Sequence, residues 1–340
     1  MNLSNEIRNK ALELGYEDCG IIKIDEMKDY AIKLSERIDR FPETKPFLEN
    51  FFKFADIKQN FPWAKSIIVC SYNYGKYKIP ENLKGLIAKS YLVDSRRDKN
   101  SDGYKSSIAF ESYLNEIGIK NKTDRPFGIT ALRWAALKAG LGIIRKNNFF
   151  YSNSGSWVKL EAWIIDKELE LKPDVQIKKC PTNCNLCVKS CPTNSLAEPY
   201  MTNRSTCVSC LTTFEGWDMP NEKYKKEIDS WVFGCDICQD VCPFNKDKWT
   251  EDEDFPVLEE LSEHISLEKI IEMDYEFLKD VMNPKFWYIS KDDVWRWKTN
   301  ALNAMLNNYE PKYNKYIDMA LHDENEKVCE MASYVKEKSQ

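Results

Sequence analysis

The chain of 340 residues is predicted to be an α+β protein in three parts, and three features of its sequence lead to this prediction. Apolar periodicities typical of helices and of strands alternate up to residue 171. Nine of the twelve cysteines then fall between residues 180 and 242, in a segment rich in Pro and Asn. Helical periodicity returns after the acidic stretch DKWTEDEDF. We therefore expect domains over residues 1–171, 172–250 and 251–340.

The elements of the first part can be located from their periodicity. Glycine follows each helical segment and is a common helix stop. β-Branched runs and alternation mark the strands. The pattern predicts helices over residues 3–14, 106–118 and 129–142, and strands over residues 19–24, 65–75 and 156–166.

The last part is predicted to be a short helical-repeat region. Residues 294–309 have the periodicity of one helix, and residues 315–338 that of a helical hairpin. Trp295 and Trp297 are expected to pack inside this tail.

The composition excludes several classes of function. The net charge of −5 gives no global signature of a nucleic-acid binder. Only two histidines occur in the whole chain, which excludes three-histidine zinc hydrolases and histidine acid–base chemistry. The short basic run of Lys223, Lys225 and Lys226 is expected to be solvated rather than to bind tRNA.

The N-terminal residues are polar, and no run of eighteen apolar residues occurs, so we expect a cytoplasmic protein without a membrane span. Twelve cysteines in a reducing compartment favour metal binding over disulfides. Cys19, Cys70 and Cys329 lie in strand or helix patterns and are expected to pack in the core.

The stretch CPTNCNLCVKSCPTN at residues 180–194 permits two interpretations. From its first cysteine the spacing is C-x3-C-x2-C, as in radical S-adenosylmethionine enzymes. From its second cysteine it is C-x2-C-x3-C-P, part of a bacterial ferredoxin motif. A second C-x2-C-x3-C-P ending follows at residues 235–243. A radical enzyme must leave one iron open, so this full second set of ligands favours a two-cluster ferredoxin module. The doubled C-x2-C-x3-C-P ending favours the same module over two structural zinc sites of four cysteines each.

Eight cysteines are assigned to two [4Fe–4S] clusters. In two-cluster modules the cysteine before proline crosses to the other cluster. We therefore expect one cluster on Cys180, Cys184, Cys187 and Cys242, and the other on Cys191, Cys207, Cys235 and Cys238. Cys210 is left over, three residues after Cys207.

Several stretches, in the same order, resemble the epoxyqueuosine reductase family, which comprises cobalamin-dependent iron–sulfur enzymes of tRNA queuosine synthesis related to reductive dehalogenases. These stretches are LRWAALKAGLGIIRKNN, GSWVKLEAWIID, CNLCVKSCPT, TCVSCLT, FGCDICQDVCPFNK and WKTNALNAML. The resemblance as a whole covers roughly residues 60–310. The match is strong for the superfamily and weak for the substrate.

The resemblance implies a nitroreductase-like α/β domain that holds cobalamin base-off, with no protein ligand below the cobalt. Single electrons would enter from a flavodoxin or ferredoxin, and a protein acid would supply a proton to the substrate. We expect a monomer that reduces epoxyqueuosine in tRNA to queuosine. Contacts with the cofactor are expected from the matching stretches and from residues 89–98, namely from Lys146, Asn147, Gly155, Ser156, Trp157, Tyr91, Asp94 and Arg97.

The chain also departs from the family pattern. The family acid is an aspartate in a D-x-x-P-x-x-E-R segment, where this chain has TDRPFGITALR. Arg133 matches the arginine, whereas Asp124 lies two residues too early. We expect Asp124 to be the proton donor and Arg133 to face the substrate. The family stretch R-Y-A-R-G-x-D-Y-H is replaced by KSYLVDSRRD, so the substrate pocket is altered.

Two alternative functions remain open at this stage. The chain could be a paralogous corrinoid reductase of a small organic substrate, or an electron-transfer protein without chemistry of its own. A corrin absorption band would exclude the second, and a basic face beside the pocket would disfavour the first.

Overall fold

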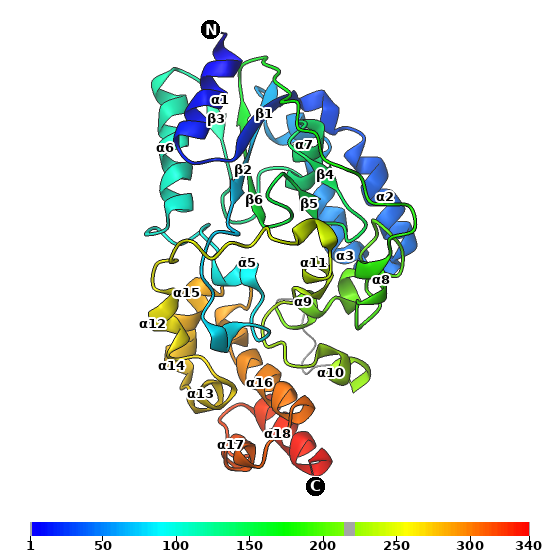
Figure 1. Ribbon diagram of the computed structural model, residues 1–340, viewed down its shortest axis with the longest axis vertical. Coiled ribbons are helices and arrows are strands. Elements are labelled where there is room, and N and C mark those ends of the chain that lie inside the picture. The colour runs from blue at the N-terminus through cyan, green and yellow to red at the C-terminus, as the bar shows by residue number, and fades with distance from the viewer. Residues whose placement is uncertain (1, 214–221, 340) are drawn as a thin grey trace.

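A computed structural model describes residues 2–213 and 222–339 of the chain (Figure 1). The molecule is elongated in this view, with the N-terminus at one end and the C-terminus at the other. The sheet lies near the N-terminus, the cysteine-rich loops occupy the middle, and the last helices form the opposite end. Within the two described ranges, no helix has the length and apolar character needed to cross a membrane.

A four-stranded sheet organises the first part, with the strand order β1-β2-β6-β3. All three strand pairs are antiparallel, which makes this part α+β. The three predicted strands are present, and a fourth pairs with the last of them. Their bounds are Asp18–Lys23 (β1), Ser66–Asn73 (β2), Asn121–Lys122 (β3) and Val158–Ile165 (β6).

Helices cover the two faces of this sheet (Figure 1). On one face, Ile7 and Phe110 belong to the same apolar cluster as Ile68 and Trp163 of the sheet. The other face packs on a second cluster that includes Ala135. The helices are α1 (Leu3–Glu13) and α6 (Asp102–Glu116) on the first face and α7 (Leu132–Lys138) on the second, while α2 (Tyr30–Arg40) packs on α7 through Tyr30 and Trp134.

Helix α7 is shorter than the predicted helix over residues 129–142. Gly128 and Gly140 both have positive φ, so the chain leaves the helical conformation on both sides. A small hairpin follows, formed by β4 (Ile143–Ile144) and β5 (Phe150–Tyr151). Short helices α3 (Lys45–Leu48), α4 (Ile57–Asn60) and α5 (Lys89–Leu92) complete the first part.

In its described residues, 172–213 and 222–250, the cysteine-rich part has loops and four short α-helices, as expected of a segment organised by metal ligands. These are α8 (Leu186–Lys189), α9 (Val208–Leu211), α10 (Glu222–Ile228) and α11 (Ile237–Asp240). Lys225 was expected to be solvated, but it is only 7% exposed, with its ammonium 3.4 Å from the ring centroid of Tyr334. The prediction was wrong for Lys225 because its stem packs against the last helix.

The tail is helical, as predicted, and the hairpin of its last two helices is confirmed. Trp295 and Trp297 are buried. The helices are α12 (Leu258–Ser262), α13 (Leu267–Glu272), α14 (Tyr275–Phe277), α15 (Asn283–Lys285), α16 (Arg296–Asn307), α17 (Asn314–Ala320) and α18 (Glu326–Lys338).

The cysteines outside the module behave differently from one another. Cys19 and Cys70 are fully buried and face each other across β1 and β2, so their packing role is confirmed. Cys329 is only partly buried, and its thiol donates to the carbonyl oxygen of Asp323 at 3.0 Å. The prediction of core packing was therefore wrong for Cys329, because the thiol lies at the end of the α17–α18 turn.

Candidate functional site

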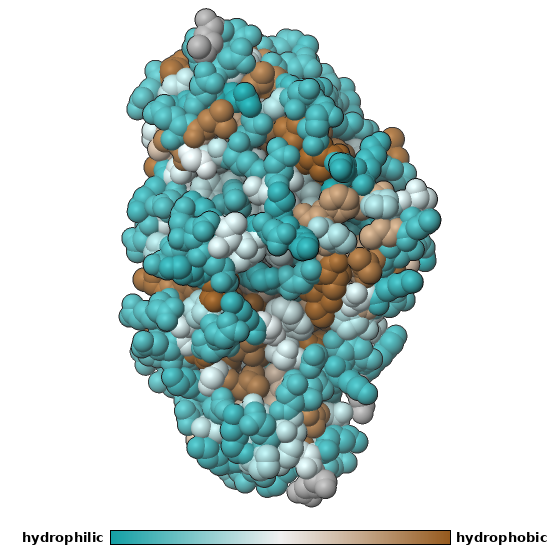
Figure 2. Space-filling model, viewed as in Figure 1, coloured by the Kyte–Doolittle hydropathy of each residue, from teal (hydrophilic) through white to brown (hydrophobic). Residues whose placement is uncertain are grey.

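The cysteine loops meet the sheet domain at the middle of the molecule. Figure 2 shows apolar residues gathered there on a mostly hydrophilic face, over α11. Four cysteines line one pocket in this region, namely Cys180, Cys184, Cys187 and Cys242. They are the four residues that the spacing assigned to one cluster. Leu186, which also lines the pocket, is 46% exposed, so this group, termed the outer quartet, lies near the surface.

The other four assigned cysteines also lie together. Burial raises the pKa values of Cys235 and Cys238, and the nearby Cys207 and Cys191 raise them further. The tertiary structure thus brings Cys191, Cys207, Cys235 and Cys238 into one group, termed the inner quartet. Cys210 lies against it, and the hydrogen bond between the two thiols lowers the pKa of Cys207 to about 6.

Lys146 and Asn147 lie in the turn between β4 and β5, against the outer quartet. The ammonium of Lys146 donates to the carbonyl oxygens of Pro181, Thr182 and Cys184 at 3.2, 2.8 and 2.8 Å. The amide of Asn147 donates to the carbonyl oxygen of Cys238 at 3.0 Å. Both side chains therefore hold the cysteine loops on the sheet domain.

Gly155 and Ser156 form a second contact with the module. A Cβ on Gly155 would lie 2.5 Å from Oδ1 of Asn245, so only glycine permits this approach. The backbone N–H of Ser156 donates to the same Oδ1 at 2.8 Å. The backbone of Gly155 and Ser156 therefore lies directly against the module.

Trp157 lies between the two parts and lines a cavity of about 440 Å³ together with Lys89 and Trp249. Trp157 is 2% exposed, and its indole N–H is buried without an acceptor. The ammonium of Lys89 lies 4.6 Å from its ring centroid.

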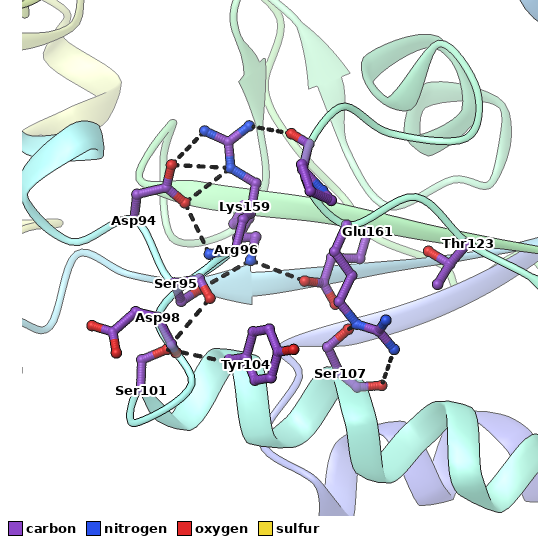
Figure 3. Close-up of polar contacts among 12 residues, drawn as sticks. Asp94, Ser95, Arg96, Asp98, Ser101, Tyr104, Ser107, Thr123, Lys159 and Glu161 are labelled. Carbon is purple, nitrogen blue, oxygen red and sulfur yellow. Dashed lines mark hydrogen bonds and ion pairs between the residues drawn. The ribbon is translucent and has the colours of Figure 1, made fainter. Parts of the chain in front are cut away.

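Asp94 is held by a single arginine (Figure 3). The guanidinium of Arg96 donates to both carboxylate oxygens, at 2.6 to 3.1 Å. Burial alone would raise the pKa of Asp94, but Arg96 and then Lys159 lower it to about 2. Asp94 is therefore ionised at neutral pH and cannot donate a proton.

A second buried ion pair lies beside it on β6. Nζ of Lys159 lies 2.9 Å from Oε1 of Glu161 and 2.9 Å from Oγ of Ser95 (Figure 3). The hydroxyl of Tyr16 donates to the other carboxylate oxygen at 2.6 Å. The sequence analysis missed this pair, although the alternation of β6 places both charges on the inward face with Trp163.

Tyr91 and Arg97, which belong to residues 89–98, have different neighbours. The Tyr91 hydroxyl is 3.0 Å from Oγ of Ser209, beside the inner quartet. Arg97 is exposed, with its guanidinium 4.2 Å from the ring centroid of Trp287. The predicted residues of this stretch therefore do not converge on one point.

The predicted acid and its arginine occupy different surroundings. Asp124 is partly buried, and its Oδ1 accepts the backbone N–H of Phe127 at 3.1 Å, which closes the turn. Arg133 is exposed at the start of α7 and donates to the carbonyl oxygen of Asn148. Arg37, which the sequence analysis missed, lies beside Arg133. Burial, and then the charge of Arg133, together lower the pKa of Arg37 to about 10.

The fold and the quartets define an iron–sulfur protein in which a two-cluster module is joined to a sheet domain. A family model described as "4Fe-4S double cluster binding domain" matches residues 179–245. The epoxyqueuosine reductase of Leadbetterella byssophila is 34% identical over 253 residues, covering 71% of this chain and 80% of that protein. That of Cellulophaga algicola is 29% identical, covering 72% and 79%. The chain belongs to the epoxyqueuosine reductase family.

Solved structures agree on the fold. An epoxyqueuosine reductase crystallised with an epoxyqueuosine-modified tRNA stem loop has a TM-score of 0.80, with 24% identity over 99% of this chain and 90% of that chain. The enzyme of Streptococcus thermophilus has a TM-score of 0.76, with 21% identity over 98% and 90%. At these identities the likeness shows the fold alone.

Proposed function

We propose that the chain is an epoxyqueuosine reductase that converts epoxyqueuosine in tRNA to queuosine. The observation that carries this proposal is family membership, shown by a relative of that name at 34% identity over 71% of the chain. The reaction consumes two electrons and two protons per epoxide. Both carbon–oxygen bonds break, a carbon–carbon double bond forms, and the oxygen leaves as water.

The electrons are proposed to pass through two [4Fe–4S] clusters, one on each quartet. The double-cluster match over residues 179–245 supports the module, and the grouping of the cysteines supports the two ligand sets. A flavodoxin or ferredoxin is the proposed donor, because each carries single electrons at low potential.

Cobalamin is the further cofactor that the family implies. Its phosphodiester is anionic and its side chains are amides, which arginine donors bind. Arg37 and Arg133 fit this chemistry. Arg37 donates to the carbonyl oxygen of Thr202 and Arg133 to that of Asn148, and because a carbonyl oxygen is uncharged, neither contact neutralises the positive charge of the arginine. Bound cobalamin supplies strongly reducing cobalt. For the eight residues expected to contact it, that role stays a prediction.

Base-off binding can be tested by spectroscopy. Both histidines lie outside the first part of the chain, so this part has no imidazole that could ligate cobalt. Electron paramagnetic resonance of the cob(II)alamin complex should therefore lack nitrogen superhyperfine splitting. Clear splitting from an axial nitrogen would contradict base-off binding.

Asp124 remains the proposed proton donor to the leaving oxygen. Because its Oδ1 already accepts the N–H of Phe127, Oδ2 would carry the proton. Arg125 does not pair with it, since that guanidinium donates to Oγ of Ser107 and to Glu111. An arginine on the carboxylate would hold it ionised, so this separation supports the acid role.

The experiment is Asp124→Asn, assayed with reduced flavodoxin on epoxyqueuosine-containing tRNA and on the free nucleoside. Positioned general acids contribute about 10²–10⁴-fold, so turnover should fall by that factor with clusters intact. Asp102→Asn is the matched control, because its side chain is 68% exposed on α6. Full turnover of Asp124→Asn would clear Asp124, and an inactive wild type on both substrates would refute the proposed reaction.

A further inference from the structure

Arg145 is a buried cation beside the outer quartet. It follows β4 and starts the turn that carries Lys146 and Asn147, with its backbone N–H donating to the carbonyl oxygen of Phe149 at 3.0 Å. Its side chain is 2% exposed and lines the same pocket as the four cysteines. The turn therefore places a positive charge at the outer cluster site, where water does not screen it.

The guanidinium of Arg145 is directed at a cluster ligand. Nη1 lies 3.6 Å from the sulfur of Cys180, within hydrogen-bonding range for sulfur, and Nη2 donates to the carbonyl oxygen of Lys178 at 2.7 Å. The guanidinium carbon lies 3.4 Å from the ring centroid of Phe244, which follows Cys242 and Pro243. The aromatic face and the carbonyl hold the group in one orientation.

The inner quartet has a different neighbour. Asp236 directly follows Cys235, is 1% exposed, and accepts the backbone N–H of Lys89 at 2.7 Å. The other oxygen of its carboxyl group is buried without a partner. An arginine thus lies at one quartet and a carboxyl group at the other.

We propose that Arg145 raises the reduction potential of the cluster on Cys180, Cys184, Cys187 and Cys242 above that of the cluster on the inner quartet. Reduction adds one negative charge to a cluster, and a buried positive charge and an N–H···S bond stabilise that charge. Arg145 is not a ligand of the cluster. It acts on the cluster through its charge and through the N–H···S bond to Cys180, and is therefore a positioning residue.

The proposed difference gives the outer cluster the role of electron acceptor. At equilibrium the first electron from an external donor therefore resides on the outer cluster. This inference rests on the two proposed clusters but not on the proposed substrate. Failure of this inference can therefore be distinguished from failure of the proposed function.

The test is redox titration of anaerobically purified protein, without substrate or cobalamin, followed by electron paramagnetic resonance. In Arg145→Met the higher of the two potentials should fall while the lower one changes less, and a fall confined to the lower one would contradict the proposal. Arg145→Lys keeps the charge without the fixed fork and should give an intermediate value. Lys179→Met is the matched control, because it removes an exposed charge next to Cys180 and should shift the potential less.

Iron content is measured first in every variant. If Arg145→Met loses iron, Arg145→Gln, which keeps an N–H donor without the charge, decides the question by the same titration. Unchanged potentials in a fully loaded neutral variant would overturn the proposal. A wild type without any cluster signal would overturn the cluster assignment and this inference with it.

Discussion

At the residue scale, two ion pairs neutralise charged side chains beside the proposed acid loop. Arg96 neutralises Asp94, and Lys159 neutralises Glu161, with side-chain exposures of 13% and 5% for the second pair. Removing one member of such a pair leaves an uncompensated buried charge and costs about 3–5 kcal/mol. These residues therefore shape the region beside the proposed acid loop and are poor candidates for proton transfer.

Lys285 is a partly buried cation whose ammonium contacts a carbonyl oxygen and an aromatic ring rather than a carboxylate. We therefore expect the stability of the protein to depend on pH through this residue. Its ammonium lies 3.4 Å from the carbonyl oxygen of Asp94 and 4.1 Å from the ring centroid of Phe255. Burial lowers its pKa to about 8 from the ordinary 10.5, although Asp94 and Asp98 raise it. Between these values the unfolded chain binds more protons than the folded chain, so stability rises with pH.

The measurement is urea unfolding of wild type and Lys285→Met from about pH 7 to about pH 10. The free energy of unfolding of wild type, relative to the variant, should rise over this range. Exposed Lys279→Met serves as the control and should show no such trend. A difference that stays constant or falls with pH would disprove the pKa shift.

Cys207 and Cys210 lie in contact, yet only Cys207 is expected to ligate iron. The inner quartet is complete without Cys210. Cys207→Ser should therefore lose one cluster, about half of the iron. Cys210→Ser should keep both. Iron and sulfide analysis of anaerobic protein checks this, and loss of a cluster in Cys210→Ser alone would reverse the assignment.

At the element scale, two short segments join the sheet domain to the module. One is the β4–β5 turn with Lys146, and the other is the entry to β6 with Gly155 and Ser156. Asn245 completes the second joint, because its amide donates to Oγ of Ser156 and to the carbonyl oxygen of Gln239, each at 2.8 Å. Secondary structure in the module is scarce, so these polar contacts fix its position.

Asn245→Ala tests this joint. The substitution leaves the buried N–H of Ser156 without its acceptor, at about 1–3 kcal/mol, whereas the carbonyl oxygen of Gln239 still accepts the N–H of Cys242. The free energy of unfolding should fall accordingly, measured with urea under anaerobic conditions. Asn100→Ala, in an exposed loop, is the control. Equal stability of the two variants would show that the joint contributes little.

At the scale of the whole molecule, one apolar cluster extends through all three parts. It contains Ile68 of the sheet, Phe233 of the module and Trp297 of the tail. Phe233 stacks on Trp297 with ring centroids 5.0 Å apart. Asn300 of α16 adds hydrogen bonds to the carbonyl oxygens of Thr212 and Val232 at 3.1 and 2.9 Å. The tail is therefore part of the support for the cluster loops.

A chain that ends at residue 250 should consequently fold poorly. Removing the tail exposes Phe233 and the apolar surface around it, and exposed patches of this kind promote aggregation. Soluble yield and iron content should both fall, and coexpression of residues 251–340 should restore part of each. A soluble fragment of residues 1–250 with a full complement of iron would contradict this prediction.

The sequence by itself determined the elements and the grouping of the cysteines. Helical and strand periods are local properties, so α1, β1, β2, β6 and α16 were predictable near their observed positions. Cysteine spacing is equally local, so both quartets were predictable. Lys225 and Cys329 were misplaced because their environments come from distant helices.

Only the tertiary structure decided what the remaining site residues touch. Lys146 and Asn147 were expected at a cofactor, which stays a prediction, and the structure shows that both also bind the cysteine loops. Arg145 went unnoticed because its contact with Cys180 joins residues 35 positions apart. The physical reason is that a side chain's partners depend on which loops pack together, and a single sequence records the residues of each loop but not their packing.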